Sequence, residues 1–311
     1  MQNCPDFNDV VMGCLGEERY AMDIKNTIEN EVSGAERAFY GLSDTAFVCC
    51  QIDGAEDGES AFKECKRIEL RDSRMALRYP LWHVDNAVVS NSRFEATCRA
   101  PMWYSNGLRL LDCVINGVKA VRECSDVTME NCCAVSVEFG WKTRGFTATN
   151  TSIEGEYLFL DSENIVLDNV KIRGKYTFQY VKNAVIRNSI LDTKDAFWHS
   201  ENVTVYDSVV SGEYLGWYSK GLRLVRCKIS GTQPLCYADG LVLEDCTTEG
   251  CDLSFEKSEL DATVLGGIHS IKNPKCGRIT ADSVGEVISE EGRERRTLLT
   301  LSELERAEKF I

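Results

Sequence analysis

Four consecutive stretches of equal length decide the fold. They read RGFTATNTSIEGEYLFLDS at 144–162, ENIVLDNVKIRGKYTFQYV at 163–181, KNAVIRNSILDTKDAFWHS at 182–200 and ENVTVYDSVVSGEYLGWYS at 201–219. A small polar residue stands at the same place in each: Asn150, Asn169, Asn188 and Asp207. A repeat of about 19 residues is a unit that buries its apolar face only by stacking on its neighbours, so it predicts a solenoid.

The repeat extends outward over most of the chain. The Asn or Asp position recurs at the same interval, with one longer step from Asn91 to Asp112 and with Arg226 in place of an Asx residue: Asp72, Asn91, Asp112, Asn131, Asn150, Asn169, Asn188, Asp207, Arg226 and Asp245. Asn and Asp tolerate left-handed backbone and bond their own backbone, which suits a corner between strands. We call this position the Asx corner.

Strand patterns flank the Asx corner. Residues four and two before it are apolar, as in Ile165 and Leu167, and so are most residues one and three after it, as in Val170 and Ile172. Two-residue alternation indicates strands with one buried face. A second corner of Asn, Asp or Gly lies five residues before the Asx corner, and a third, mostly Gly, lies five after it.

Three corners and three short strands predict an all-β fold, a three-sided parallel β-helix of about ten coils. A left-handed β-helix repeats every six residues and a pentapeptide solenoid every five. Neither period fits a whole number of times into the observed repeat, so we expect the right-handed form.

The two ends depart from the repeat. We expect an N-terminal cap over residues 1–45, the β-helix over 46–288, and a charged segment with a capping helix over 289–311. Ser302 and Glu305 fit a helix capping box, with Leu304, Ala307 and Ile311 on one face. Such a helix would cover the last coil; the alternative is that it binds a partner.

Composition excludes several classes of partner. The formal charge is −14, from 35 basic and 49 acidic residues, which disfavours nucleic acid and anionic membranes. No signal peptide or membrane-length apolar run occurs, so a soluble cytoplasmic protein is expected. The 15 cysteines are then expected to be reduced thiols. With no CxxC motif and few histidines, we expect no metal site and no cofactor.

All five tryptophans share one column, nine residues before the Asx corner. The column also contains Arg122 and Gln179, which would be costly in a narrow apolar core. The adjacent column, ten before the corner, is mostly apolar, so we place that one inside and the tryptophan column outside. The alternative is that the tryptophans fill the core. The outer column predicts a binding stripe with these members: Trp82, Trp103, Arg122, Trp141, Trp198 and Trp217.

A second column, eight before the corner, runs beside the tryptophans and contains His199 and Tyr218. Aromatic rings flanked by hydrogen-bonding groups suit sugars, so we expect His199, Tyr214 and Tyr218 to contact an oligosaccharide together with the tryptophans. In the same column Glu123, Lys142 and Asp161 occupy consecutive coils. They are interpreted as an opposite-charge ladder, the alternative being a glycosidase-like carboxylate pair.

The densest polar and aromatic cluster surrounds Asp195 and Glu213, which could be neighbours on adjacent coils. If the protein is an enzyme, Asp195 and Glu213 are the candidate acid and base. The alternative is that they are ordinary surface charges with no catalytic role. The chemistry would be that of a polysaccharide lyase or a glycoside hydrolase. The cysteines at 113, 132, 227 and 246 occupy a small inward position and are expected to fill the core.

Several segments resemble a bacterial family of β-helix proteins known only as a domain of unknown function and similar in fold to pectate lyases. The segments include 79–82 (YPLW), 102–105 (MWYS), 194–198 (KDAFW) and 212–217 (GEYLGW). The resemblance implies the β-helix fold. It implies no particular reaction, because none is assigned to that family and a fold does not determine one. No cluster of three carboxylates on adjacent coils matches the calcium site that pectate lyases use.

Two functional hypotheses follow from the stripe. The first is a carbohydrate-binding or carbohydrate-processing protein. The second is a non-catalytic scaffold whose stripe docks a protein or a second copy of the chain, as a homo-oligomer.

Overall fold

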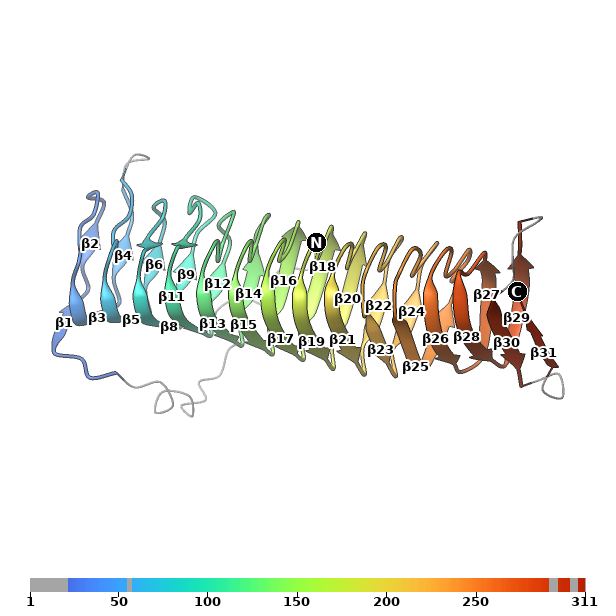
Figure 1. The fold of residues 1–311 in the computed structure, drawn as a ribbon. Helices are drawn as coiled ribbons and strands as arrows, with labels where there is room; N and C mark the ends of the chain where they lie inside the picture. Colours follow the sequence, from blue (N-terminus) through green and yellow to red (C-terminus); the bar gives the residue numbers. More distant parts are fainter. Residues whose placement is uncertain (1–21, 55–57, 291–295, 303–306, 311) are drawn as a thin grey trace.

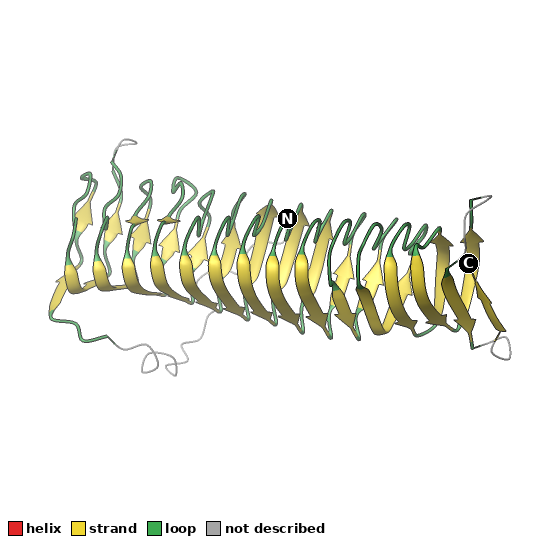
Figure 2. Ribbon diagram, viewed as in Figure 1, coloured by secondary structure: helices red, strands yellow, loops and turns green. Residues whose placement is uncertain are grey.

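The computed structural model describes residues 22–54, 58–290, 296–302 and 307–310. These form a long solenoid of about 14 coils, a right-handed parallel β-helix (Figure 1). Strands and loops make up the whole described chain, which contains no helix (Figure 2). It therefore has no helical segment able to span a membrane in these ranges.

The first face of the solenoid is a parallel sheet of strands from successive coils. Each strand pairs with its equivalent one coil away, for example Ile165 with Ala184. Its strands are β1 (Asn26–Glu29), β3 (Ser43–Val48), β5 (Lys66–Arg71), β8 (Asp85–Ser90), β11 (Asn106–Leu111), β13 (Ser125–Glu130), β15 (Arg144–Thr149), β17 (Glu163–Asp168), β19 (Lys182–Arg187), β21 (Glu201–Tyr206), β23 (Arg223–Val225), β25 (Leu241–Glu249), β26 (Glu259–Val264), β28 (Cys276–Ala281) and β30 (Thr297–Leu301).

The second face follows the Asx corner. Its strands are β2 (Val32–Ser33), β4 (Gln51–Ile52), β6 (Arg74–Met75), β9 (Arg93–Phe94), β12 (Val114–Ile115), β14 (Cys133–Val135), β16 (Ser152–Glu156), β18 (Lys171–Lys175), β20 (Ile190–Lys194), β22 (Val209–Ser211) and β24 (Lys228–Ser230). β25 continues through its corner and pairs with both β23 and β24. Nearer the C-terminal end, β27 (Gly267–Lys272) pairs with β29 (Ser283–Ile288).

The third side contains little strand. The two strands β7 (Leu81–Trp82) and β10 (Met102–Trp103) pair there, Trp103 also forms an isolated parallel bridge with Arg122, and elsewhere on this side the described chain mostly turns. Left-handed residues alternate through this side, as at Tyr176, Phe178 and Tyr180. It is the side that carries the tryptophans.

The Asx corners have the predicted geometry. Asn150, Asn169 and Asn188 have φ of 51°, 52° and 50°, the left-handed region that Asn and Asp tolerate best. Their side chains bond between coils, with Asn169 Nδ2 donating to Asn150 Oδ1 at 2.7 Å. Arg226 replaces this contact by a bidentate ion pair with Asp207, at 2.6 and 2.7 Å.

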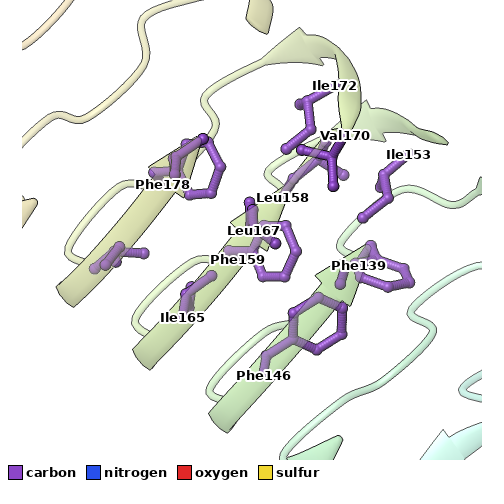
Figure 3. Packing of buried hydrophobic residues seen from close by; sticks show 14 of the residues in the cluster. Phe139, Phe146, Ile153, Leu158, Phe159, Ile165, Leu167, Val170, Ile172 and Phe178 are labelled. Carbon is purple, nitrogen blue, oxygen red and sulfur yellow. The ribbon is translucent and has the colours of Figure 1, made fainter. Parts of the chain in front are cut away.

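The core is a narrow apolar column along the solenoid axis. Phe159, Phe178 and Phe197 stack in register, with centroids 5.4 and 5.2 Å apart. Isoleucines and leucines from the two sheet faces complete each layer, as Leu167 of β17 and Ile172 of β18 do in the coil of Phe159 (Figure 3). The predicted inner column therefore lies inside.

Close packing of coils at the third corner requires glycine. A Cβ on Gly174 would lie 1.8 Å from the Gly155 carbonyl oxygen of the preceding coil. Gly155, Gly212 and Gly231 meet a backbone oxygen in the same way. The glycines of this column thus serve the stacking.

The β-helix extends further at both ends than the sequence predicted. β1 and β2 already form a coil in register with β3 and β4, so the capping region expected over 1–45 contains solenoid from Asn26; residues 1–21 lie outside the described part. The corner signal was missed because Cys49 occupies that position, with φ of 54°. Counting about ten coils was therefore too few.

The predicted C-terminal helix is wrong where the structure describes it. Residues 298–301 belong to β30, because Thr297, Leu299 and Leu301 alternate into the core with a period of two. β31 (Ala307–Phe310) then pairs antiparallel with β30. Residues 303–306 and 311, part of the proposed capping box and apolar face, lie outside the described residues.

Candidate functional site

The tryptophan column lies outside the core. Trp82, Trp103, Trp141, Trp198 and Trp217 are all half-buried, whereas the inner column beside them is buried. The alternative in which the indoles fill the core is wrong. Arg122 lies within the same column, with its guanidinium 5.1 Å from the Trp141 ring centroid.

In-register stacking decides which part of each ring is open. Trp82 stacks on Trp103, and Trp198 on Trp217, in both cases with centroids 5.6 Å apart. The interplanar angles are 13° and 9°. Each pair therefore covers one face of each indole, and the column presents ring edges more than open platforms.

The indole N–H groups divide the column into two halves. Trp141, Trp198 and Trp217 each donate to a carbonyl oxygen of the next coil, in Tyr157, Tyr214 and Gln233, at 2.6, 2.7 and 2.9 Å. Those of Trp82 and Trp103 are buried and have no hydrogen-bond partner among the described residues. Two extra residues between Phe94 and Arg99 break the repeat close to these two tryptophans.

The second column forms a continuous ladder of rings. Tyr180, His199, Tyr218 and Tyr237 stack with centroids 5.0, 5.1 and 5.0 Å apart. Tyr180 is 50% exposed and Tyr218 43%. The structure thus places His199 and Tyr218 side by side on the surface, next to Trp198 and Trp217.

The charged ladder expected in this column does not form. Glu123 pairs instead with the neighbouring Arg122, at 3.3 Å. Lys142 and Asp161 are exposed and form no ion pair with any described residue. Their side chains stay hydrated because on this open side water competes with the weak attraction of exposed charges.

Asp195 occupies an unusual place in a column of tyrosines. Tyr157 and Tyr176 hold the equivalent position in the two preceding coils, and Tyr214 holds it in the next coil. Asp195 is only 5% exposed. Burial raises the pKa of its carboxyl, Lys194 opposes this, and the nearby Glu213 carboxylate raises that pKa further. The result is a carboxyl group that holds its proton more tightly than an ordinary aspartate.

Glu213 lies on the adjacent coil, as predicted. The Asp195 backbone N–H donates to the Glu213 carbonyl oxygen at 2.9 Å. The Glu213 carboxylate is exposed and binds Lys194, at 2.5 Å. Asp195 and Glu213 are therefore neighbours in contrasting surroundings, one desolvated and one ion-paired.

A groove runs beside Asp195, along the third corner. Its volume is about 630 Å³, and it is lined by Val135, Glu154, Gly155, Glu156, Arg173, Gly174, Lys175 and Lys194. Lys175 pairs with Glu156 across adjacent strands at 3.1 Å. The tyrosine column follows directly after this pair in the chain, with the rings of Tyr157 and Tyr176 stacked at 4.7 Å.

Sequence reasoning missed the lysines of this groove and the tyrosines beside it. Lys175, Lys194, Tyr157 and Tyr176 were not among the candidates. The signal was present, since Tyr157, Tyr176 and Tyr214 each stand at one fixed position before an Asx corner.

The described cysteines are mostly core residues. Cys113, Cys132, Cys227 and Cys246 are buried free thiols, as predicted. Burial raises the pKa of Cys124 to about 12, so its thiolate is disfavoured near neutral pH. Cys133 departs from the expectation of reduced thiols because it is disulfide-bonded. Within the described ranges no group of three or more His, Cys, Asp and Glu side chains is placed to hold a metal ion.

A family match covers nearly the whole solenoid. Residues 26–301 match the family described as "Protein of unknown function (DUF3737)". The chain belongs to this family. DUF3737 thus corresponds here to the β-helix itself, from β1 to β30. No protein of curated function matches the chain in sequence.

Solved structures resemble this DUF3737 chain only distantly. Tailspike protein 3 of bacteriophage CBA120 is 11% identical over 91% of this chain and 57% of its own, with a TM-score of 0.45. A mutant tailspike of E. coli bacteriophage HK620, in complex with a pentasaccharide, is 10% identical over 88% and 72%, with a TM-score of 0.48. PfbA, a surface adhesin of Streptococcus pneumoniae, is 9% identical over 93% and 74%, with a TM-score of 0.34. Matches this weak carry no argument about function.

The indole hydrogen bonds predict unequal effects of one substitution. Trp198→Phe removes a bonded N–H and leaves the Tyr214 carbonyl without its donor, so the free energy of unfolding should fall by about 1 kcal/mol more than in Trp103→Phe. Trp103→Phe removes a donor that has no described partner. Urea denaturation of the two variants measures the difference; equal losses would contradict the assigned bonding.

The raised pKa of Asp195 predicts a pH-dependent cost. The stability linked to a raised carboxyl pKa is present below the unfolded pKa of ~3.9 and is lost as pH rises through the folded value. At pH 7 the native protein therefore bears a desolvated charge, which Asp195→Asn removes. The melting temperature of Asp195→Asn should exceed that of wild type by a few degrees at pH 7, and this gain should shrink below pH 4.

The exposed Asp192, on the same strand β20, gives the matched control. Asp192→Asn should leave the melting temperature nearly unchanged across this pH range. A lower melting temperature for Asp195→Asn at pH 7 would mean that Asp195 is a stabilising residue, contrary to the account.

Proposed function

We propose that this protein binds a linear oligosaccharide that lies along the solenoid axis, over the groove and the adjoining aromatic columns. The observation that carries the proposal is one juxtaposition. The groove of about 630 Å³, the Tyr157–Tyr176 stack and the desolvated Asp195 adjoin one another on β16, β18 and β20 and the turns after them.

The chemistry of the groove suits hydroxyl groups. Lys175 and Lys194 are each bound by a carboxylate, of Glu156 and Glu213 respectively. Such pairs attract a free charge weakly yet keep N–H donors and carboxylate acceptors side by side. A sugar offers both kinds of partner through each hydroxyl group.

The tyrosines supply the apolar part of the contact. Tyr157 is 38% exposed and stacks on Tyr176, and Lys175 lies 5.5 Å from the Tyr176 centroid. A ring with an apolar body and a hydroxyl tip serves an amphipathic ligand such as a pyranose. Trp198, Tyr214, Trp217, His199 and Tyr218 continue this surface toward the C-terminal end through their exposed edges.

The repeat favours an extended ligand. Equivalent side chains recur at every coil, spaced by the ~4.8 Å separation of adjacent strands. A polymer whose units follow one another along the axis meets the same kind of contact on each coil. Affinity should therefore rise with the length of the oligosaccharide.

The raised pKa of Asp195 favours a second role, that of an acid in glycan cleavage. A carboxyl with a raised pKa carries its proton in a larger fraction of molecules than an ordinary aspartate does and can donate it to a leaving glycosidic oxygen, while an ionised neighbour such as Glu213 acts as the base. We propose Asp195 as the acid and Glu213 as the base. The reaction would be that of a glycoside hydrolase or, with proton abstraction by the base, a polysaccharide lyase.

Intrinsic tryptophan fluorescence tests the binding proposal. The protein is titrated with linear neutral, amino and uronic-acid oligosaccharides of increasing length. We expect saturable quenching by at least one series, with affinity increasing with chain length. Tyr176→Ala should weaken this binding about tenfold, equivalent to about 1.4 kcal/mol.

Tyr206→Ala is the matched control, because Tyr206 lies on β21 of the first face, away from the groove. It should bind as wild type does. Any bound glycan is also assayed for cleavage, where Asp195→Asn and Glu213→Gln should each abolish products while binding persists. Absence of quenching by every series, or unchanged affinity in Tyr176→Ala, would contradict the binding proposal.

A further inference from the structure

The two ends of the solenoid are finished differently. At the C-terminal end, the antiparallel strand β31 covers the outer edge of β30. At the N-terminal end, β1 pairs with β3 and β2 with β4, and no described strand lies on their outer sides. An uncovered parallel edge of this kind is a template for a further strand.

The backbone groups of β1 point outward from this edge. The Asn30 N–H, directly after β1, donates forward to Val48 O at 2.9 Å, as the Cys49 N–H does to Arg71 O one coil further on, at 3.0 Å. Backbone groups of successive strand residues point to opposite sides, so Ile28 shares the direction of Asn30. The backbone groups of Thr27 and Glu29 therefore point backward, where no described coil precedes them.

The same edge exposes apolar surface. Ile28 is only partly buried and pairs in register with the core residue Phe47. Phe39, Phe47 and Phe62 form a ring cluster there, with centroids 4.9 to 5.3 Å apart. A strand laid on this end would therefore bury the core-facing Ile28 as well as satisfy backbone groups.

The described chain before β1 leaves the edge open. Lys25 N–H donates to Asp44 O at 2.8 Å, and Met22 N–H to Glu69 Oε1 at 3.4 Å. Residues 22–25 thus run along the outside of the first face, toward β3 and β5, and away from the outer edge of β1 (Figure 1).

Charge selects the direction of an added strand. Lys25 precedes β1, whereas Glu29 ends it and Glu31 follows it. Antiparallel pairing of two copies of β1 brings Lys25 of each near the glutamates of the other. It also places Ile28 opposite Ile28 of the second copy, so the apolar core continues across the contact.

We propose that two copies of this chain join head to head through antiparallel pairing of their β1 strands. The contact is isologous, so it closes with two chains. Because β31 blocks the opposite end, the dimer does not extend into a fibre. The aromatic columns take no part in this contact and remain open for the ligand.

Light scattering of the full chain tests the proposal. Wild type should have twice the 34.9 kDa chain mass, and its maximum dimension in small-angle X-ray scattering should be nearly double that of one solenoid. Lys25→Glu should give monomers, because it places like charges across the contact. Adding Glu29→Lys and Glu31→Lys to that variant should restore the dimer.

Three further results separate this contact from others. Lys309→Glu, on β31, should stay dimeric, and so should Tyr218→Ala, on the aromatic surface. Circular dichroism melts confirm that each variant is folded, since Lys25 also lies 3.6 Å from Asp44. A monomeric wild type, a dimer indifferent to Lys25→Glu, or one lost in Lys309→Glu or Tyr218→Ala would overturn the proposal.

Discussion

Backbone hydrogen bonding between coils in strict register is the constraint on which the whole structure depends. Each strand bonds to the strand one coil before and after it, and the chain returns to the equivalent position in every coil of the regular repeat. Five left-handed residues per coil turn the chain often enough to close the circuit, as at Asn164, Asn169, Tyr176, Phe178 and Tyr180. Asx and glycine residues carry much of this strain at low cost.

Register also determines the surface chemistry. A residue type repeated at one position becomes a ladder, so phenylalanines stack inside and tyrosines, histidine and tryptophans stack outside. Stacking stabilises the rings and at the same time covers their faces. A buried titratable group occurs where such a column is interrupted: Asp195 interrupts the column that contains Tyr176 and Tyr214.

The sequence was sufficient to predict which residues line up in columns along the solenoid. It was not sufficient to predict where the solenoid begins and ends, or which individual side chains contact one another. The regular spacing of the Asx corners indicated the fold, and the polar members Arg122 and Gln179 indicated that the tryptophans face outward. The period is hidden at Cys49, where the corner residue is not Asx. At the C-terminal end the capping-box pattern of Ser302 and Glu305 predicted a helix, whereas residues 307–310 form a strand that pairs with β30. The pairing of Glu123 with Arg122 depends on side-chain conformations, which a repeated sequence position does not specify. The groove depends on how the chain bends after Gly155 and Gly174, and the repeat does not specify that bend either.

Cross-linking of residues one coil apart tests the register most directly. Val166 and Val185 are register partners on β17 and β19, whereas Thr204 lies one coil further on. The account predicts that Val166→Cys with Val185→Cys forms an intramolecular disulfide under mild oxidation, identified by peptide mass spectrometry. Val166→Cys with Thr204→Cys should not, because two strand spacings of ~4.8 Å exceed the reach of a disulfide. Equal cross-linking of the two pairs, or cross-linking of the second alone, would contradict the stacking of coils described here.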